Sequence, residues 1–134
     1  MSLSIHLHFN GQCQAAFEYY ETLSIGKIGL MLSYSKSAMK NTVPAAWSNK
    51  IIHANISING SEISGSDVQI NEYKTPQGFN VLLSINDALK VKAIFEGLSI
   101  NGTIILPLQK TFWSPCYGIV VDQFGIPWKI NLIV

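Results

Sequence analysis

The sequence predicts an α+β fold made from two copies of one unit, each running strand, helix, strand, strand, strand. Three observations predict it. Residues 3–9 alternate apolar and polar side chains, which is typical of a strand with one buried face. Residues 12–23 then carry apolar side chains at helical spacing. The same order starts again at residues 79–85, so we expect two βαβββ modules that form one curved, antiparallel-rich mixed sheet, a cup with helices on its outer face.

The first module is predicted to span residues 3–67. After its helix, Gly26 and Gly29 interrupt the chain. The dipeptide Asn59-Gly60 is a strong hairpin signal between two short apolar runs. The elements expected after the helix are a strand, a loop and the two strands of that hairpin: residues 28–34, 35–50, 53–58 and 62–66.

A polar segment at 68–78 is predicted to link the first module to the second, which spans 79–134. Asn86 and Asp87 are expected to cap the second helix, as Asn10 and Gly11 cap the first. Asn10 and Asn86 hold equivalent places, as do the turn glycines Gly60 and Gly125, which supports the repeat. The remaining strands are expected at residues 103–106, 117–122 and 126–133.

Composition narrows the classes of function. The chain has 134 residues, 48% hydrophobic and 13% charged, with a net charge of +1. No basic run is present, so nucleic-acid binding lacks its electrostatic basis. No apolar stretch is long enough to span a membrane, and no signal peptide is visible, so we expect a cytoplasmic protein with free thiols at Cys13 and Cys116. The apolar composition favours a buried subunit interface.

The alternation divides each sheet into two faces. The core is expected to contain Ile5, Leu7, Phe9, Ala54, Ile56, Ile58, Val81, Leu83, Ile85, Trp128 and Ile130. All three histidines fall on the opposite, polar face, where few long charged side chains occur. That face is predicted to line a small-molecule site, with these candidate ligand-binding residues: His6, His8, His53, Asn55, Glu62, Ser64, Asn80 and Lys129. The alternative is a polar face that is only solvated.

A group of aromatic residues near the loops has two interpretations. Trp113 is a further ligand-binding candidate, because it could form an aromatic wall together with Trp47, Phe112 and Tyr117. Aromatic residues near loops are equally typical of subunit interfaces. Both interpretations remain open at the level of sequence.

Several segments resemble the vicinal oxygen chelate superfamily of glyoxalases, bleomycin-resistance proteins and dioxygenases, and in particular its PhnB-like branch. They are His8-Phe-Asn-Gly-Gln-Cys-Gln-Ala-Ala-Phe-Glu-Tyr-Tyr, Ile51-Ile-His-Ala, Asn59-Gly-Ser, Gly65-Ser-Asp, Pro107-Leu-Gln-Lys-Thr-Phe-Trp and Phe124-Gly-Ile-Pro-Trp-Lys-Ile-Asn. The resemblance implies paired βαβββ modules, a small-molecule site inside the cup, and a homodimer whose modules are often exchanged between subunits.

Metal-using members of the superfamily place one ligand on the first and one on the fourth strand of each module. The corresponding positions here are Ser4 (or Ile5), Asn80, Ser64 and Lys129, and none of these is a good metal ligand. The resemblance, with these departures, therefore predicts a small-molecule-binding protein that lacks the usual metal site. No cofactor is predicted.

Two alternatives to a binding protein remain open at the level of sequence. The first is a lyase, isomerase or dioxygenase that holds a divalent metal ion at a displaced site formed by His6, His8 and Glu62. The second is a structural or interaction protein. Sequences of the PhnB-like branch often carry a methyltransferase label, but no Gly-rich strand-to-helix turn suited to a nucleotide-like cofactor is present, which disfavours that reaction.

Overall fold

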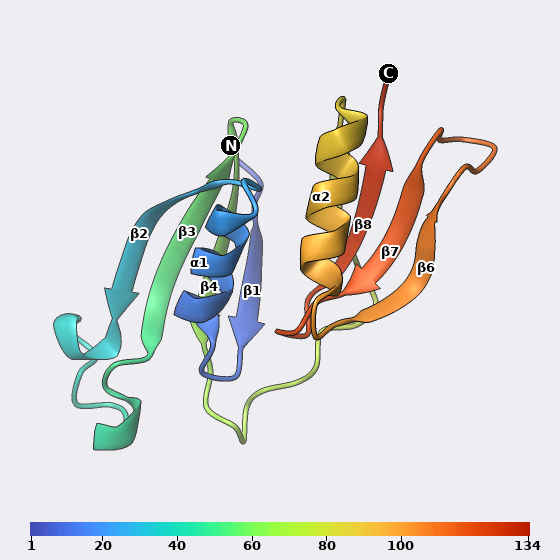
Figure 1. Cartoon of the computed structure of the whole chain (residues 1–134). Coiled ribbons are helices and arrows are strands. Elements are labelled where there is room, and N and C mark those ends of the chain that lie inside the picture. Colours follow the sequence, from blue (N-terminus) through green and yellow to red (C-terminus); the bar gives the residue numbers. More distant parts are fainter. The chain divides into compact units, whose positions relative to one another are not determined.

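The computed structural model describes residues 1–134 and contains two compact units, Met1–Lys74 and Thr75–Val134. The boundary between them falls inside the polar segment 68–78. Each unit holds one helix and one four-stranded sheet (Figure 1). No helix is long and apolar enough to cross a membrane.

Unit 1 is built from β1 (Ile5–Phe9), α1 (Cys13–Thr22), β2 (Lys27–Ser33), β3 (Ile51–Ile58) and β4 (Ser61–Asp67). The strand order is β1-β4-β3-β2, with β1 parallel to β4 and the other pairs antiparallel. The expected irregular loop between β2 and β3 contains two short 3-10 turns at Tyr34–Lys36 and Ala45–Trp47. The last strand of the unit, β4, returns beside the first, β1, which forms one edge of the sheet.

Unit 2 repeats this plan with β5 (Val81–Ile85), α2 (Ala88–Ser99), β6 (Thr103–Gln109), β7 (Tyr117–Val121) and β8 (Pro127–Leu132). Its strand order is β5-β8-β7-β6, again with one parallel pair, β5 and β8. The turn glycines Gly60 and Gly125 both adopt a φ of +86°, a conformation that favours glycine. The predicted α+β class and the two βαβββ modules are confirmed.

Each unit buries one face of its sheet under its own helix. In unit 1 the buried residues come from β1, α1, β3 and β4: Leu7, Phe9, Ala16, Phe17, Tyr20, Ala54, Ile56 and Ile63. In unit 2 they come from α2, β7 and β8: Val91, Ile94, Leu98, Val120, Trp128 and Ile130. The predicted core was wrong at Ile5, which is 42% exposed because it begins an edge strand.

The start of α1 differs from the prediction. Gln12 occupies the N-cap position and its side chain makes no capping bond, and neither Asn10 nor Gly11 supplies one. Instead Asp67, at the end of β4, accepts a hydrogen bond from the Cys13 backbone N–H at 2.8 Å. The start of α2 follows the prediction, since the Asp87 side chain accepts from the N–H groups of Leu89 and Lys90.

Both units carry a bulge in the strand that follows the helix. In β2, Ile28 pairs with Ile56 and Met31 with Ala54, so two residues of β2 face Asn55 alone. In β6, Ile104 pairs with Val120 and Leu106 with Ile119, so Ile105 is extra. These bulges bend the two edge strands at equivalent places.

Candidate functional site

Three imidazole rings gather on the face of the unit 1 sheet that lies opposite α1. The ring centroid of His6 is 5.6 Å from that of His8, edge to face, and 5.7 Å from that of His53, stacked. His6 and His8 are two residues apart on β1, so their side chains leave the same face of the strand. His53 lies on β3, on the other side of β4 from β1.

Two serines on β4 allow this gathering. Ser64 pairs with His6 in the parallel β1–β4 register, and Ser66 pairs with His8. Their short side chains leave room above β4, and the His6 ring leans over the strand into that space. Its Nδ1 lies 2.7 Å from Ser64 Oγ and its Nε2 lies 2.9 Å from Ser66 Oγ. We call His6, His8, His53, Ser64 and Ser66 the imidazole face.

The environment of His6 favours its neutral form. Burial lowers the pKa of the His6 imidazole below 6.5, and the neighbouring His8 and His53 lower it further. A neutral imidazole has one N–H donor and one acceptor nitrogen, so it bonds one serine as donor and the other as acceptor. Both His6 nitrogens are therefore bonded to serines of the same sheet, which fixes the His6 ring between the rings of His8 and His53.

Among the remaining candidates of unit 1, Asn55 lies next to this centre, because it pairs with Ser64 in the β3–β4 register, but its side chain has another partner. Asn55, on β3, uses its side-chain oxygen to accept the Leu30 N–H at 2.8 Å, so its amide caps the β2 bulge. Glu62, on β4, is exposed and pairs with Ser57. Ser4 precedes β1, and the β1 residue opposite Ser64 is His6. No group of three or more His, Cys, Asp or Glu side chains is placed to hold a metal ion.

In unit 2 the equivalent face has a different character. Lys129, on β8, lies between Leu82 of β5 and Ile119 of β7. Asn80 precedes β5, and the β5 residue that pairs with Lys129 is Leu82. Trp113 lies in the loop before β7, with its ring 5.2 Å from Tyr117 and 4.6 Å from Phe112. The structure thus unites His6, His8, His53 and Ser64, but not the unit 2 candidates Asn80, Trp113 and Lys129.

Sequence reasoning missed two polar residues of β4. Ser66 is the second partner of His6, and the alternation through Glu62 and Ser64 could have found it. Asp67 is 1% exposed and accepts from Cys13 N–H through Oδ1 and from Ile51 N–H through Oδ2, both at 2.8 Å. Burial raises the pKa of the Asp67 carboxyl, although these donors oppose the shift. The segment Gly65-Ser-Asp, which carries part of the family resemblance, contains Asp67, but nothing in it indicates a buried carboxylate.

Comparison with known proteins shows which family this chain matches. Residues 1–131 match the family model described as 3-demethylubiquinone-9 3-methyltransferase. The protein YjdN of Escherichia coli (strain K12) is 33% identical over 141 residues, covering 99% of this chain and 96% of that protein.

Solved structures of other proteins have the same fold. Protein PA1353 from Pseudomonas aeruginosa superposes with a TM-score of 0.89 at 28% identity, covering 98% of this chain and 97% of that one. The PhnB protein from Bacillus cereus superposes with a TM-score of 0.83 at 21% identity, covering 99% and 100%. The fosfomycin resistance protein FosX from Listeria monocytogenes, solved with Mn(II), shares the fold alone, with a TM-score of 0.68 at 8% identity over 100% of this chain and 93% of that one.

Proposed function

Because the chain belongs to the 3-demethylubiquinone-9 3-methyltransferase family, a PhnB-like group with the vicinal oxygen chelate fold, we propose that it binds a small polar molecule on the imidazole face of unit 1 without a resident metal ion. The observation that carries the proposal is the fixed His6 ring, bonded through both nitrogens and flanked by His8 and His53. Such a rigid polar group is preorganised for recognition.

The chemistry of the face suggests the kind of ligand. His8 and His53 each offer ring nitrogens that can donate or accept, and no carboxylate hydrogen-bonds any of the three rings. A ligand rich in hydroxyl, carbonyl or carboxylate oxygens would match these groups. Asn55 is not part of the proposal, because its side-chain oxygen already accepts a hydrogen bond from Leu30 N–H in the β2 bulge.

Absence of the family's usual metal site is part of this proposal. The positions next to each other on β1 and β4 hold His6 and Ser64, and those on β5 and β8 hold Leu82 and Lys129. A serine, a leucine and a lysine do not bind divalent transition metals, and the His6 lone pair is already engaged. The displaced site of His6, His8 and Glu62 is therefore not favoured as the basis of a metal-dependent enzyme.

The reaction in the family's description would require a methyl-donor cofactor, and the residues of this chain do not fit one. Neither strand-to-helix turn is Gly-rich, since they read Asn10-Gly11-Gln12 and Asn86-Asp87. Both helix starts are already occupied by the protein's own carboxylates, those of Asp67 and Asp87. A cofactor carboxylate or phosphate would find no open helix N-terminus there.

The test uses the full chain, purified without an affinity tag and treated with a chelator. A library of small hydroxy acids and amides is screened by NMR, following the imidazole signals. We expect a binder to shift the signals of His8 and His53, and we expect His8→Ala and His53→Ala to weaken its binding about tenfold each. Lys36→Ala, on an exposed turn, is the control and should leave binding unchanged.

Two results would overturn parts of the proposal. Stoichiometric Zn, Mn, Ni or Fe found by elemental analysis before chelation would refute the metal-free site. Conversion of a bound compound into a product, followed by mass spectrometry, would show an enzyme in place of a binding protein.

A further inference from the structure

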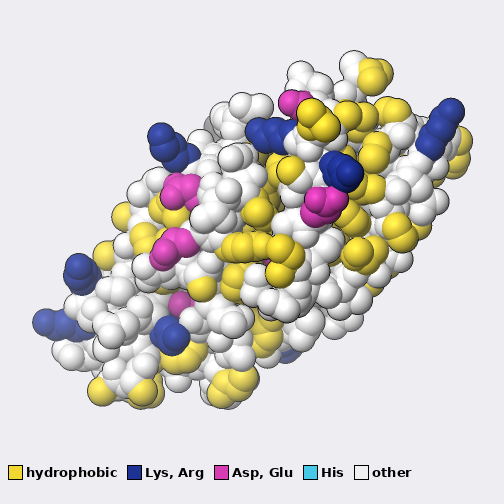
Figure 2. All heavy atoms as spheres, in the orientation of Figure 1, with side chains coloured by type: hydrophobic (Ala, Val, Ile, Leu, Met, Phe, Trp, Pro, Cys, Tyr) yellow, Lys and Arg dark blue, Asp and Glu magenta, His cyan; other side chains and the backbone are white.

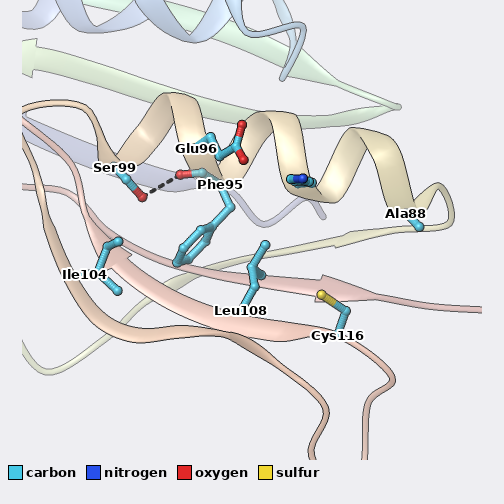
Figure 3. A pocket seen from close by; sticks show the side chains of 8 residues that line it. Ala88, Phe95, Glu96, Ser99, Ile104, Leu108 and Cys116 are labelled. Carbon is cyan, nitrogen blue, oxygen red and sulfur yellow. Dashed lines mark hydrogen bonds between the residues drawn. The ribbon is translucent and has the colours of Figure 1, made fainter.

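An open cavity of about 550 Å³ lies on the surface of unit 2, between α2 and β6. It is on the helix side of its sheet, whereas Leu82 and Lys129 lie on the opposite face. Its walls include Phe95 of α2, Ile104 and Leu108 of β6, and Cys116 just before β7 (Figure 3). The volume falls within the range of small-molecule sites, about 300–1,000 Å³.

The backbone explains why space opens here. The β6–β7 register shifts twice, between Ile104 and Leu106 and again between Leu106 and Gln109, so β6 bends where it lines the cavity. On β7, Gly118 lets the Phe95 ring lie directly on the sheet. A Cβ at Gly118 would stand 2.7 Å from Phe95 and 2.9 Å from Leu108. The apolar surface that Phe95 and Leu108 form over Gly118 is therefore a consequence of the fold of unit 2.

Few polar groups face this apolar surface of the cavity. The Ser99 hydroxyl donates to the Phe95 carbonyl oxygen at 2.7 Å, so its hydrogen is already used. Figure 3 shows the Glu96 carboxylate turned along the helix, away from Leu108 and Cys116. Figure 2 shows basic and acidic side chains next to hydrophobic ones over α2. The remaining charged lining residue is Lys92, one helical turn before Glu96.

We propose that this cavity is a second binding site, for a small molecule with an apolar body and one anionic group. The body packs on Phe95, Ile104 and Leu108, and the anionic group pairs with the Lys92 ammonium. This site involves none of the residues of the imidazole face, so the two proposals stand or fall separately.

The probe is 1-anilinonaphthalene-8-sulfonate, whose aromatic rings and sulfonate match the proposed class. Binding to the full chain is measured by isothermal titration calorimetry. We expect saturable binding at one site, weakened about tenfold or more by Ala88→Trp, which places an indole at the cavity wall. Ala93→Trp is the matched control, because Ala93 is exposed on the same helix and does not line the cavity. Ile104→Trp is a second filling variant.

Lys92→Gln tests the charge, and we expect it to weaken binding several-fold. Unchanged affinity in both Ala88→Trp and Ile104→Trp would overturn the site. Equal affinity for the probe in Lys92→Gln would overturn the anionic part of the ligand class. His53→Ala should bind the probe as the wild type does, and loss of binding in that variant would place the probe elsewhere.

Cys116 provides an independent readout. Its side chain is half-buried at the cavity wall, whereas Cys13 is fully buried and burial raises the pKa of its thiol. A disulfide reagent such as 5,5′-dithiobis(2-nitrobenzoate) should therefore react with Cys116 alone in the folded chain, and Cys116→Ser should abolish the reaction. We expect saturating probe to slow this reaction, and an unchanged rate would contradict the proposal.

Discussion

Asp67 supplies acceptor oxygens to two parts of unit 1 that are distant in the sequence. Oδ1 accepts from Cys13 N–H at the start of α1, and Oδ2 accepts from Ile51 N–H at the start of β3. Its backbone oxygen also accepts the Tyr34 hydroxyl, at 3.1 Å. Asp67 thus joins α1 and β3 through its buried carboxylate, and the loop after β2 through its backbone carbonyl oxygen.

Asp67→Ala should lower the free energy of unfolding by about 1–3 kcal/mol for each of the two backbone donors that it leaves buried without a partner. Urea unfolding followed by circular dichroism measures the loss. Glu72→Ala is the control, because Glu72 is exposed in the segment that follows β4. A loss in Asp67→Ala no larger than in the control would show that the two hydrogen bonds contribute little.

His6 should titrate below the ordinary histidine value of 6.5, because burial and two neighbouring imidazoles disfavour its protonated form. The unfolded chain then binds this proton more readily than the folded one. Stability contributed by neutral His6 is therefore present above about pH 6.5 and is lost as the pH falls below that value.

The measurement is the pH dependence of the His6 imidazole signals by NMR, assigned through His6→Gln. In His53→Ala the pKa of His6 should rise toward 6.5, because one repelling neighbour is gone. A His6 pKa at or above 6.5 in the wild type would contradict this prediction.

At the scale of secondary-structure elements, each helix leads into its next strand through a glycine that touches a neighbouring strand. A Cβ at Gly26, before β2, would stand 2.5 Å from the Ser57 carbonyl oxygen of β3. A Cβ at Gly102, before β6, would meet the carbonyl oxygen of Val121 in β7 and stand 2.8 Å from that of Leu98. The two glycines permit the same close approach in both units.

Gly26→Ala and Gly102→Ala should each destabilise the protein by about 1–3 kcal/mol, because the added methyl group presses on backbone that cannot swing away. Thermal unfolding of the two variants measures the effect. Gly60→Asn is the comparison, since a Cβ there meets nothing and asparagine tolerates a positive φ. A tolerated alanine at both positions would mean that the strands can separate at little cost.

Alternation of apolar and polar side chains predicts β1 and β3, because a period of two is a local property. The hairpin signal at Asn59-Gly60 and the repeat of the module support the other strands. The helix set at residues 12–23 and the cap at Asp87 were predicted on similar local grounds. What could not be predicted depends on register between distant strands. The pairing of β1 with β4 brings Ser64 and Ser66 to His6, and the β2 bulge engages the side-chain oxygen of Asn55.

At the scale of the whole molecule, the loop before β7 exposes a large apolar surface. Phe112 is 97% exposed and Trp113 is 56% exposed, and their rings touch edge to face. Exposed aromatic pairs of this kind are enriched at protein interfaces. We propose that this loop forms part of the subunit interface of a homodimer. Exchange of modules between the two subunits belongs to the same proposal.

The double variant Phe112→Ser and Trp113→Ser should shift the chain from dimer toward monomer, measured by light scattering after size-exclusion chromatography at several concentrations. Ile70→Ser removes a similarly exposed apolar side chain and serves as the control. A wild-type chain that stays monomeric at high concentration would contradict the proposal, as would a double variant that stays dimeric.

The different origins of the two helix caps have a consequence for refolding. The cap of α2 comes from Asp87, two and three residues before the amides that it binds. The cap of α1 comes from a residue 54 positions away, so it forms only after β4 has docked beside β1. Closing a short loop costs little chain entropy and closing a long one costs more. We therefore expect α2 to become ordered before α1 during refolding. In pulsed hydrogen exchange the α2 amides should be protected before those of α1. Simultaneous protection would show that the caps do not set this order.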